Sequence, residues 1–383
     1  MKAIVLLSVS LSYPTAMEPL VNIYSVTQFG AIANDQKDDS DAFQDALSTL
    51  QDGDTLIVPD GHYLLCNTIS LLNKKDISII GIGKPELSKC APFSGEYLFY
   101  VKYTDGLWVN NLTFNGLNNG DIEPVWGEQG LYLASTANSY IVNSHFRYFG
   151  DAALRLTTSA DEEMYAVTSN NITVMQNTFE NCGQVTTTQA TAGTQLGGSK
   201  NILFKGNNFN GCTLKLSSRT EVSNAKILNN TFQNINGTAV ELSYYSDVLF
   251  EKNKVKNVNG FLINVYPNTR AEKNVKWGDI RINDNVFDGS EQGIRLQSFV
   301  NTENAVDPIR NISITNNMFQ NIKFDNVNES KYRSIIRTLT QNNELSFSNV
   351  TIKNNQYRLE DRTTFISIDP KTKKIDIEEN HPL

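Results

Sequence analysis

One short pattern recurs along this chain and limits its fold more than any other feature: an asparagine followed two or three positions later by a large apolar residue. It occurs nine times, with steps of 23 to 38 residues between the apolar positions. These anchor positions are Phe114, Phe146, Phe179, Phe209, Phe232, Val255, Phe287, Phe319 and Tyr357. The shortest step is the length of one bare coil, and the longer steps correspond to a coil with an inserted loop.

A short strand with alternating apolar residues precedes the anchors, as at residues 172–174, 202–204, 280–282 and 312–314, and a second short strand follows each turn. Strands of period two that return at a regular spacing indicate a solenoid. We therefore predict an all-β fold, a single-stranded right-handed parallel β-helix, with the anchors stacked inside. We expect the asparagines at the bends, where their side chains can bond to neighbouring coils and their backbone can adopt the left-handed conformation.

The segment before the first coil predicts a cap for the open end of the solenoid. Ser40 can cap a short helix whose apolar residues form one stripe. The stripe consists of Phe43, Ala46, Leu47 and Leu50. A helix at this position would cover the core that a terminal coil otherwise exposes to water.

The same segment resembles a known family. It reads Phe-Gly-Ala at residues 29–31, Asp-Asp-Ser at 38–40, Phe-x-x-Ala-Leu at 43–47 and Val-Pro-x-Gly-x-Tyr at 58–63. This string resembles the opening of the pectate-lyase-like β-helix superfamily, which includes polygalacturonases, alginate epimerases and phage tailspikes. The resemblance implies an enzyme that acts on a polysaccharide by hydrolysis, β-elimination or epimerisation.

Four segments follow from these patterns. They are a signal peptide at 1–16, an N-terminal cap at 22–60, a parallel β-helix at 61–360 and a C-terminal tail at 361–383. Lys2, the apolar run after it and the small residue Ala16 resemble an export signal. We therefore expect a secreted, periplasmic or cell-surface protein without a membrane span.

The four cysteines leave two states open. Cys66, Cys90, Cys182 and Cys212 lack the short spacing of a zinc site. They can be buried thiols, or they can form the disulfides 66–90 and 182–212 if the chain is exported.

The formal net charge of −8 argues against nucleic acid or an anionic membrane surface as partner. It does not exclude an anionic sugar polymer, because a local basic strip can lie on an acidic protein. We expect a polysaccharide partner, and the sequence leaves the oligomeric state open.

The central residues of the strands that follow the anchors form the most informative pattern. In a parallel solenoid such residues stack about 4.8 Å apart. The predicted column is Tyr132, Arg155, Thr188, Lys215, Glu241, Asn264, Arg295 and Arg337. Half of these residues are cationic on an acidic chain, which favours a groove for a uronate polymer. The alternative is an ordinary solvated sheet face, where polar residues are also expected.

β-Elimination is the reaction that we favour narrowly. It requires a cation that neutralises the uronate carboxylate, a base that removes the proton at C5 and an acid that protonates the leaving oxygen. We assign Lys215 as the base and Arg295 or Arg155 as the cation. Tyr244 or Tyr245 is the candidate acid. The predicted substrate-binding residues are Tyr132, Arg155, Arg219, Tyr245, Asn264 and Arg337.

Hydrolysis is the second reading, and it would need two carboxylates about 5–9.5 Å apart. Glu241, which we expect within salt-bridge reach of Lys215, is one. Asp151 lies about three coils away, roughly 14 Å, and Asp247 lies on a loop. The polygalacturonase motifs are incomplete, since residues 150–152 lack a second aspartate and no Gly-His-Gly exists. C5 epimerisation and a non-catalytic carbohydrate-binding solenoid remain alternatives.

No cofactor follows from the sequence. A calcium ion could replace the neutralising arginine, but the column offers no cluster of carboxylates for it, and Asp247 and Glu251 are the nearest. His145 is the only histidine within the coils, and we expect it on a different side from the column.

Overall fold

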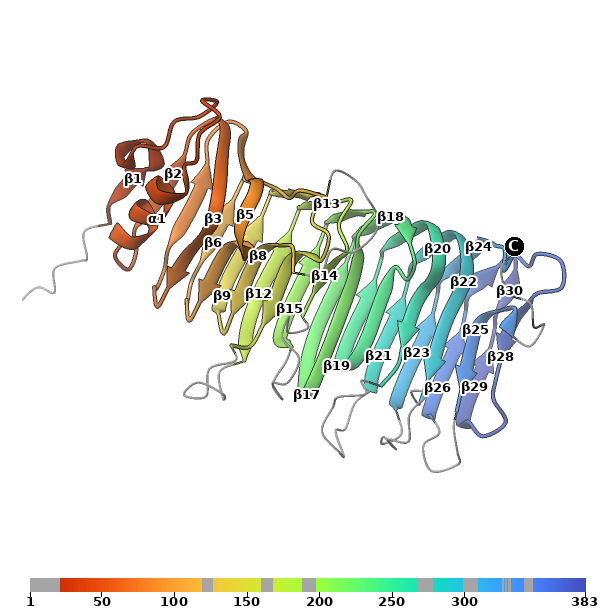
Figure 1. Ribbon diagram of the computed structural model, residues 1–383. Helices are drawn as coiled ribbons and strands as arrows, with labels where there is room; N and C mark the ends of the chain where they lie inside the picture. Colours follow the sequence, from red (N-terminus) through yellow and green to blue (C-terminus); the bar gives the residue numbers. More distant parts are fainter. Residues whose placement is uncertain are drawn as a thin grey trace, which may run out of the picture.

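The computed structural model describes residues 21–118, 127–159, 168–187, 198–267, 278–298, 309–325, 327, 329, 332–340 and 347–383, without the side chains of 219–221. Within these residues the chain winds as a right-handed parallel β-helix (Figure 1). Each coil pairs with the next one in parallel register. The fold class predicted from the recurring anchors is therefore confirmed.

Three parallel sheets form the sides of the solenoid. The back sheet contains β1 (Ile23–Ser25), β2 (Thr55–Val58), β4 (Ser78–Gly81), β6 (Trp108–Asn110), β9 (Ala137–Val142), β12 (Ser169–Met175), β15 (Ser199–Lys205), β21 (Gly278–Asn283), β23 (Arg310–Thr315), β26 (Ser348–Lys353) and β29 (Lys373–Glu378). The anchor sheet contains β7 (Thr113–Asn115), β10 (His145–Arg147), β13 (Thr178–Glu180), β16 (Asn208–Asn210), β18 (Thr231–Asn236), β24 (Met318–Ile322), β27 (Gln356–Tyr357) and β30 (His381–Pro382). The groove sheet contains β8 (Gln129–Ala134), β11 (Ala152–Thr157), β14 (Gln184–Thr186), β25 (Ser334–Leu339) and β28 (Thr364–Ser367).

Six longer strands turn a corner and belong to two sheets. The strands β3 (Gly61–Leu72), β5 (Pro85–Lys102), β20 (Lys254–Val265) and β22 (Val286–Gln297) run from the anchor sheet into the groove sheet. The strands β17 (Thr213–Leu228) and β19 (Val240–Glu251) run from the groove sheet into the back sheet. In the coils that contain these strands, one continuous strand therefore passes from one sheet into the next.

The anchors stack inside the solenoid as predicted. Ring centroids of successive phenylalanines lie 4.7 Å apart for Phe114 and Phe146 and 4.5 Å apart for Phe209 and Phe232, with nearly parallel planes. Val255 interrupts the stack because it has no ring. The ring of Phe250, from the adjacent sheet, lies 5.9 Å from that of Phe232 and keeps the aromatic contact across this coil.

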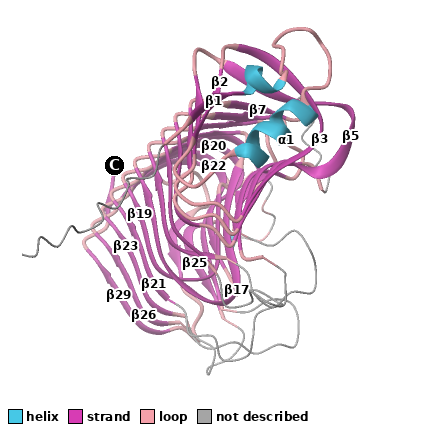
Figure 2. Cartoon of the chain, turned by 90° about the vertical axis from the view of Figure 1, so that its left-hand side faces the viewer, coloured by secondary structure: helices cyan, strands magenta, loops and turns pink. Residues whose placement is uncertain are grey.

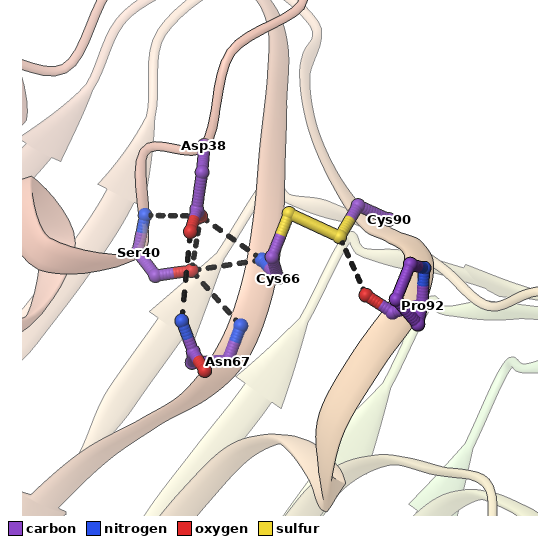
Figure 3. The surroundings of a disulfide bond; sticks show 6 residues. All are labelled: Asp38, Ser40, Cys66, Asn67, Cys90 and Pro92. Carbon is purple, nitrogen blue, oxygen red and sulfur yellow. Dashed lines mark hydrogen bonds between the residues drawn. A yellow bond between two sulfur atoms is a disulfide. The ribbon is translucent and has the colours of Figure 1, made fainter.

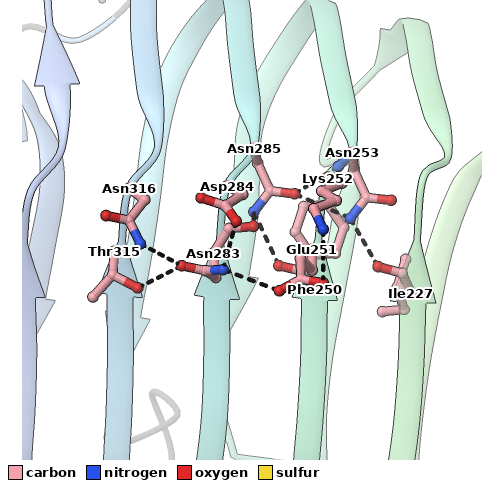
Figure 4. A network of polar contacts seen from close by, with 10 residues as sticks. All are labelled: Ile227, Phe250, Glu251, Lys252, Asn253, Asn283, Asp284, Asn285, Thr315 and Asn316. Atoms are coloured by element: carbon pink, nitrogen blue, oxygen red, sulfur yellow. Dashed lines mark hydrogen bonds and ion pairs between the residues drawn. The ribbon is translucent and has the colours of Figure 1, made fainter.

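A ladder of buried asparagines joins the coils at the bend before the anchor sheet (Figure 4). The Nδ2 of Asn253 donates to the carbonyl of Ile227 in the previous coil and to the Oδ1 of Asn285 in the next. Its own Oδ1 accepts from the backbone N–H of Asn230. The ladder consists of Asn177, Asn207, Asn230, Asn253, Asn285, Asn317, Asn355 and Asn380. The predicted bonding between coils is confirmed.

In the first two coils the pattern asparagines Asn111 and Asn143 are left-handed as predicted, with φ values of 57° and 50°. In the later coils the left-handed residue is the one before the ladder asparagine, which corrects the prediction there. Lys252, Asp284 and Asn316, for example, have φ values of 55°, 55° and 56°. The ladder asparagine must keep its side chain inside the bend to reach both coils, so the reversal of the chain falls on the preceding, exposed position.

The short helix α1 (Ser40–Thr49) follows the 3-10 helix η1 (Val26–Phe29) and lies across the N-terminal opening of the solenoid (Figure 2). Its predicted stripe is buried, since Phe43, Ala46, Leu47 and Leu50 are at most 2% exposed. The N-cap is Asp39 rather than Ser40. The Oγ of Ser40 is used elsewhere, because it accepts from the backbone N–H groups of Cys66 and Asn67 in β3 (Figure 3).

Both candidate disulfides are formed, and each joins neighbouring coils. Cys66 bonds to Cys90 and Cys182 to Cys212, with Cα atoms 4.9 Å apart in both pairs. The first disulfide lies beside the contact between Ser40 and β3, so it ties the capped end to the next coil (Figure 3). Of the two alternatives left open by the sequence, the structure therefore contains the disulfides and not buried thiols.

The solenoid continues beyond the boundary predicted at residue 360. The strands β28, β29 and β30 pair with β25, β26 and β27 and complete one more coil. The proposed signal peptide at 1–16 lies outside the described residues. Among the residues that are described, no helix has the length and apolar character needed to span a membrane.

Replacing Asn253 by alanine should lower the free energy of unfolding by about 1–3 kcal/mol, because buried backbone groups of Asn230 and Ile227 lose their partner. Denaturant unfolding of the purified variant measures this. The exposed Asn236 of β18 is the matched control, and Asn236→Ala should change stability by less than half as much. Equal effects of the two substitutions would contradict the role of the ladder.

Candidate functional site

The polar column lies on the outward side of the groove sheet in continuous register. Its members from the N-terminal end are Tyr100, Tyr132, Arg155, Thr186, Lys215, Glu241, Asn264, Arg295 and Arg337. Thr186 takes the place assigned to Thr188, which lies outside the described residues. The reason is a shorter bend, since the anchor and column positions are 7 residues apart in this coil, from Phe179 to Thr186, and 9 in the coil before, from Phe146 to Arg155.

Arg155 is a structural residue and not the exposed cation that we predicted. It is only 1% exposed, and its Nη2 donates to both carboxylate oxygens of Asp151 at 3.1 Å. Its Nε donates to Gln129, and Gln184 donates to the same carboxylate of Asp151. This buried pair is satisfied within the protein, so neither Arg155 nor Asp151 is available to a substrate.

Three side chains meet at one carboxylate oxygen in the middle of the column. The Nζ of Lys215 lies 3.1 Å from the Oε2 of Glu241, as expected for adjacent coils. The hydroxyl of Tyr266 donates to the same Oε2 at 2.8 Å. The side chains of Lys215 and Glu241 are 32% and 21% exposed. We call Lys215, Glu241 and Tyr266 the central cluster.

The surroundings of the central cluster hold the Tyr266 hydroxyl in its protonated form. Burial raises the pKa of Tyr266 well above its usual value, and the neighbouring charge of Glu241 raises it further. The raised pKa keeps the proton on the phenol at neutral pH but also makes it a weaker acid, so its candidacy as proton donor rests on its position beside Glu241.

Two arginines follow in the next coils. The Nε of Arg295 donates to Asn264, and its guanidinium lies 4.2 Å from the centre of the Phe261 ring. Arg337 donates to the carbonyl of Tyr332 and lies 5.2 Å from the same Phe261 ring. Burial, followed by the charge of Arg295, lowers the pKa of Arg337 to about 10. Arg337 therefore stays cationic at neutral pH.

The charge of these two arginines is only partly balanced nearby, because Glu241 acts on Arg295 from outside salt-bridge distance. Within the described part of the chain, no carboxylate lies within salt-bridge distance of either guanidinium. Instead, aromatic faces and neutral oxygens hold them. Arg337 is only 7% exposed, whereas Arg295 is partly exposed, so Arg295 is the better placed of the two to meet an anion in the groove.

Tyr244 and Tyr245 are in the core, which overturns their predicted roles as acid and substrate contact. They are 1% and 0% exposed. Tyr244 has a φ of 56°, and this left-handed residue turns β19 from the groove sheet into the back sheet, so strand alternation fails there. The hydroxyl of Tyr245 donates to the carbonyl of Ser199.

Tyr266, which the sequence analysis missed, occupies the position in the groove that was given to Tyr244. The sequence pattern that could have identified Tyr266 is the inward–outward alternation of the strand in the coil after Glu241. Asn264 faces outward, Val265 is fully buried, and the following residue faces outward again, because its N–H continues the pairing with Leu242. Extending the alternation of β20 by one residue would have identified it.

The remaining residues predicted to bind substrate differ in how exposed they are to the groove. Asn264 is only 5% exposed and serves as the acceptor for Arg295. Tyr132 is 7% exposed and packs against Tyr97 at the N-terminal end of the column. The side chain of Arg219 lies outside the described residues.

The carboxylates considered for calcium lie away from the column. Asp247 faces Arg281 on the back sheet at 3.2 Å, and Glu251 accepts from Asn283. Across the described ranges, no three histidine, cysteine, aspartate or glutamate side chains gather to hold a metal ion. His145 contacts Glu180 on the anchor sheet, on a different side from the column as expected.

Comparisons with known proteins agree with the architecture. The sequence model of the family described as rhamnogalacturonase A/epimerase, pectate lyase-like, matches residues 23–264. No curated protein sequence matches the chain.

Solved structures resemble the whole solenoid at low sequence identity. The surface adhesin PfbA of Streptococcus pneumoniae has a TM-score of 0.71 and 16% identity, over 94% of this chain and 92% of that one. An exopolygalacturonase from Thermotoga maritima has a TM-score of 0.62 and 12% identity, over 94% and 93%. The A-module of a mannuronan C-5 epimerase from Azotobacter vinelandii has 0.60 and 16%, over 93% and 100%. Identities this low establish a shared fold.

Replacing Asp151 by alanine should destabilise the protein by about 3–5 kcal/mol, because it leaves the Arg155 charge buried without its partner. The double variant Asp151→Leu/Arg155→Met removes both charges and should be less destabilised than the single one. Denaturant unfolding compares the two. A double variant that is as unstable as the single variant, or worse, would contradict this account of the pair.

Proposed function

Because the chain belongs to the pectate-lyase-like rhamnogalacturonase A/epimerase family, we propose that it is a lyase that cleaves a uronate-containing polysaccharide by β-elimination along the polar column. One observation carries the proposal. Lys215 and Tyr266, the base and acid candidates, contact one carboxylate oxygen of Glu241. Arg295 and Arg337 lie one and two coils after Tyr266 and three and four coils after Lys215, and neither forms a salt bridge with a carboxylate among the described residues.

The charge of this part of the groove suits an acidic sugar. Lys215, Arg295 and Arg337 carry three positive charges against the single negative charge of Glu241. A uronate carboxylate at the arginines would gain charge-assisted hydrogen bonds, and its neutralisation would make the proton at C5 more acidic. The planar guanidinium on the ring of Phe261 is already oriented, so little rotational freedom is lost on binding.

Binding of the sugar would also prepare the base. In the ligand-free molecule, Lys215 donates to the carboxylate of Glu241. A bound sugar ring removes water from this pair, and loss of water disfavours both charged forms. The ammonium proton can then pass to the Oε2 of Glu241, which leaves a neutral amine on Lys215.

Every proton that moves in the elimination can then be supplied and accepted by the central cluster. The amine of Lys215 takes the proton from C5, the C4–C5 double bond forms, and the bond from C4 to the glycosidic oxygen breaks. Tyr266 gives its phenolic proton to that leaving oxygen. The protonated Glu241 returns a proton to Tyr266 across their 2.8 Å contact. All three side chains end in their starting protonation states, and no water is consumed.

Hydrolysis is less well supported by the side chains in the groove. It needs a second carboxylate about 5–9.5 Å from the first. Among the described members of the column, Glu241 is the single carboxylate, since Asp151 is buried with Arg155. Epimerisation at C5 would use the same first step and differ only in the return of a proton to the opposite face.

Purified protein mixed with a panel of uronate polymers should produce the ultraviolet absorbance of an unsaturated uronate. Lys215→Ala should reduce the rate by about 10²–10⁴-fold, because the proton at C5 loses its acceptor. Lys226 lies on the same strand but faces out from the back sheet, so Lys226→Ala is a matched control that should keep wild-type activity.

Other outcomes of this assay would replace the proposal. New reducing ends without absorbance would indicate a hydrolase that uses Glu241. A changed uronate configuration without cleavage would indicate an epimerase. Binding without any product would indicate a carbohydrate-binding solenoid.

Tyr266→Phe should lower kcat by about 10²–10⁴-fold and change KM little, because the ring remains in place and only the donated proton is lost. Steady-state kinetics on the polymer that responds to the wild type measures both constants. A change in KM alone would assign Tyr266 to substrate binding and not to proton transfer.

A further inference from the structure

The N-terminal end of the polar column has a different chemistry from the part that holds the central cluster. Three tyrosines from the neighbouring strands β5 and β8 gather there. The ring centroids of Tyr97 and Tyr100 lie 5.1 Å apart in a stacked arrangement, and Tyr132 lies 4.4 Å from Tyr97. We call Tyr97, Tyr100 and Tyr132 the tyrosine cluster. Tyr97 and Tyr100 are partly exposed, whereas the rings of the anchor stack are fully buried.

A cleft of about 340 Å³ adjoins this cluster. Lys89, Phe93, Glu96 and Glu128 are among the residues that line it. Glu96 directly precedes Tyr97, and burial, followed by the neighbouring Tyr132 and Glu96, raises the pKa of the Tyr97 hydroxyl. The tyrosine rings do not line the cleft themselves, but Glu96 does, and its position next to Tyr97 in the chain places the cleft beside the tyrosine cluster.

Among the described residues, the cations at this end of the groove are already engaged by the protein. Lys102, two residues after Tyr100 on β5, is partly exposed, and its Nζ lies 4.8 Å from the centre of the Tyr103 ring. Arg155, the next member of the column, is buried and bound to both oxygens of Asp151. Lys89 is 5% exposed, its Nζ donates to the carbonyl of Glu96 and lies over the ring of Phe93, and two glutamates share its cleft. A carboxylate placed here would lose water and would have to compete with these contacts for a cationic partner, which is unfavourable.

We propose that the tyrosine cluster and its cleft form a subsite for an uncharged sugar residue, which stacks on the exposed tyrosine rings. This proposal rests on the proposed function, since it assumes that a polysaccharide lies along the column. The apolar C–H face of a sugar ring can pack on the tyrosine rings, and its hydroxyls can bond to the polar groups beside them. The subsite is three coils before Lys215 at Tyr132 and four coils before it at Tyr100, at a distance on the order of 14–19 Å.

The proposal gives the groove a direction. A carboxylate binds toward the C-terminal end, at Arg295 and Arg337, and an uncharged sugar binds toward the N-terminal end. The two ends should also differ in their response to salt, because ion pairs are screened whereas aromatic stacking is not. Affinity measured at two salt concentrations therefore separates the two subsites.

Calorimetric titration with two matched sets of probes tests the subsite. One set contains oligomers of galacturonate, mannuronate and guluronate, and the other contains the same oligomers with their carboxylates reduced to hydroxymethyl groups. At least one reduced oligomer should bind the wild-type protein with an affinity that salt does not change. Tyr100→Ala should weaken this binding about tenfold, while Tyr100→Phe should keep it, because the ring remains.

Control variants separate a local effect from a general loss of structure. Trp108 and Tyr140 also form a stacked, exposed aromatic pair, with centroids 5.4 Å apart, but on the back sheet. Tyr140→Ala should leave binding of the reduced oligomer unchanged. Arg295→Gln should weaken the uronate oligomers and reduce their salt dependence, without affecting the reduced ones. Equal melting temperatures of Tyr100→Ala and the wild type would show that the variant is folded, and Tyr97→Ala is a second variant for the same site.

The failure of this proposal can be told apart from the failure of the lyase proposal. If no reduced oligomer binds, or if Tyr100→Ala and Tyr97→Ala bind it like the wild type, the subsite is wrong, even when uronate polymers are cleaved. If the reduced oligomer binds and depends on Tyr100 but no polymer is cleaved, the subsite stands and the lyase proposal is wrong.

Discussion

The in-register stacking of coils is the constraint on which the rest of this structure depends. Parallel backbone pairing sets the spacing along the solenoid, and the buried asparagine ladder fixes the bend at which each coil returns. Because the ladder asparagine bonds to the coils on both sides, one coil cannot slip by a residue without breaking bonds in two others. Chain-length differences between coils are therefore confined to loops at the corners. The strands stay aligned although the anchors are 23 to 38 residues apart in sequence.

This alignment turns single outward residues into a continuous surface. Lys215 and Glu241 are 26 residues apart, and they meet because they occupy the same position in adjacent coils. Residues of the same column nevertheless differ in burial and in ion pairing, because their neighbouring side chains differ. Arg155 has Asp151 four residues earlier and becomes a buried structural pair, whereas Arg295 and Arg337 rest on Phe261 and form no salt bridge with a described carboxylate.

The fold itself does not choose a reaction. An adhesin, a polygalacturonase and an epimerase module share the solenoid with this chain at 12–16% identity. What distinguishes one such protein from another is the set of side chains along the groove. In this chain, that set is a cluster around Glu241 that can move protons in a closed cycle, a cationic end and an aromatic end. The chemistry proposed here follows from these side chains and not from the shape of the solenoid.

The sequence by itself determined the repeat, the stacked anchors, the capping helix and the adjacency of Lys215 and Glu241, because all of these depend only on periodicity and on position within a coil. It also determined that most of the column is polar. Only the tertiary structure decided which polar residues remain accessible. The left-handed turn at Tyr244 reversed the alternation that we assumed and placed both Tyr244 and Tyr245 in the core. The burial of Arg155, the entry of Tyr266 into the site and the pairing of the cysteines depend on corners and bends, where local backbone geometry and contacts between coils outweigh the strand pattern.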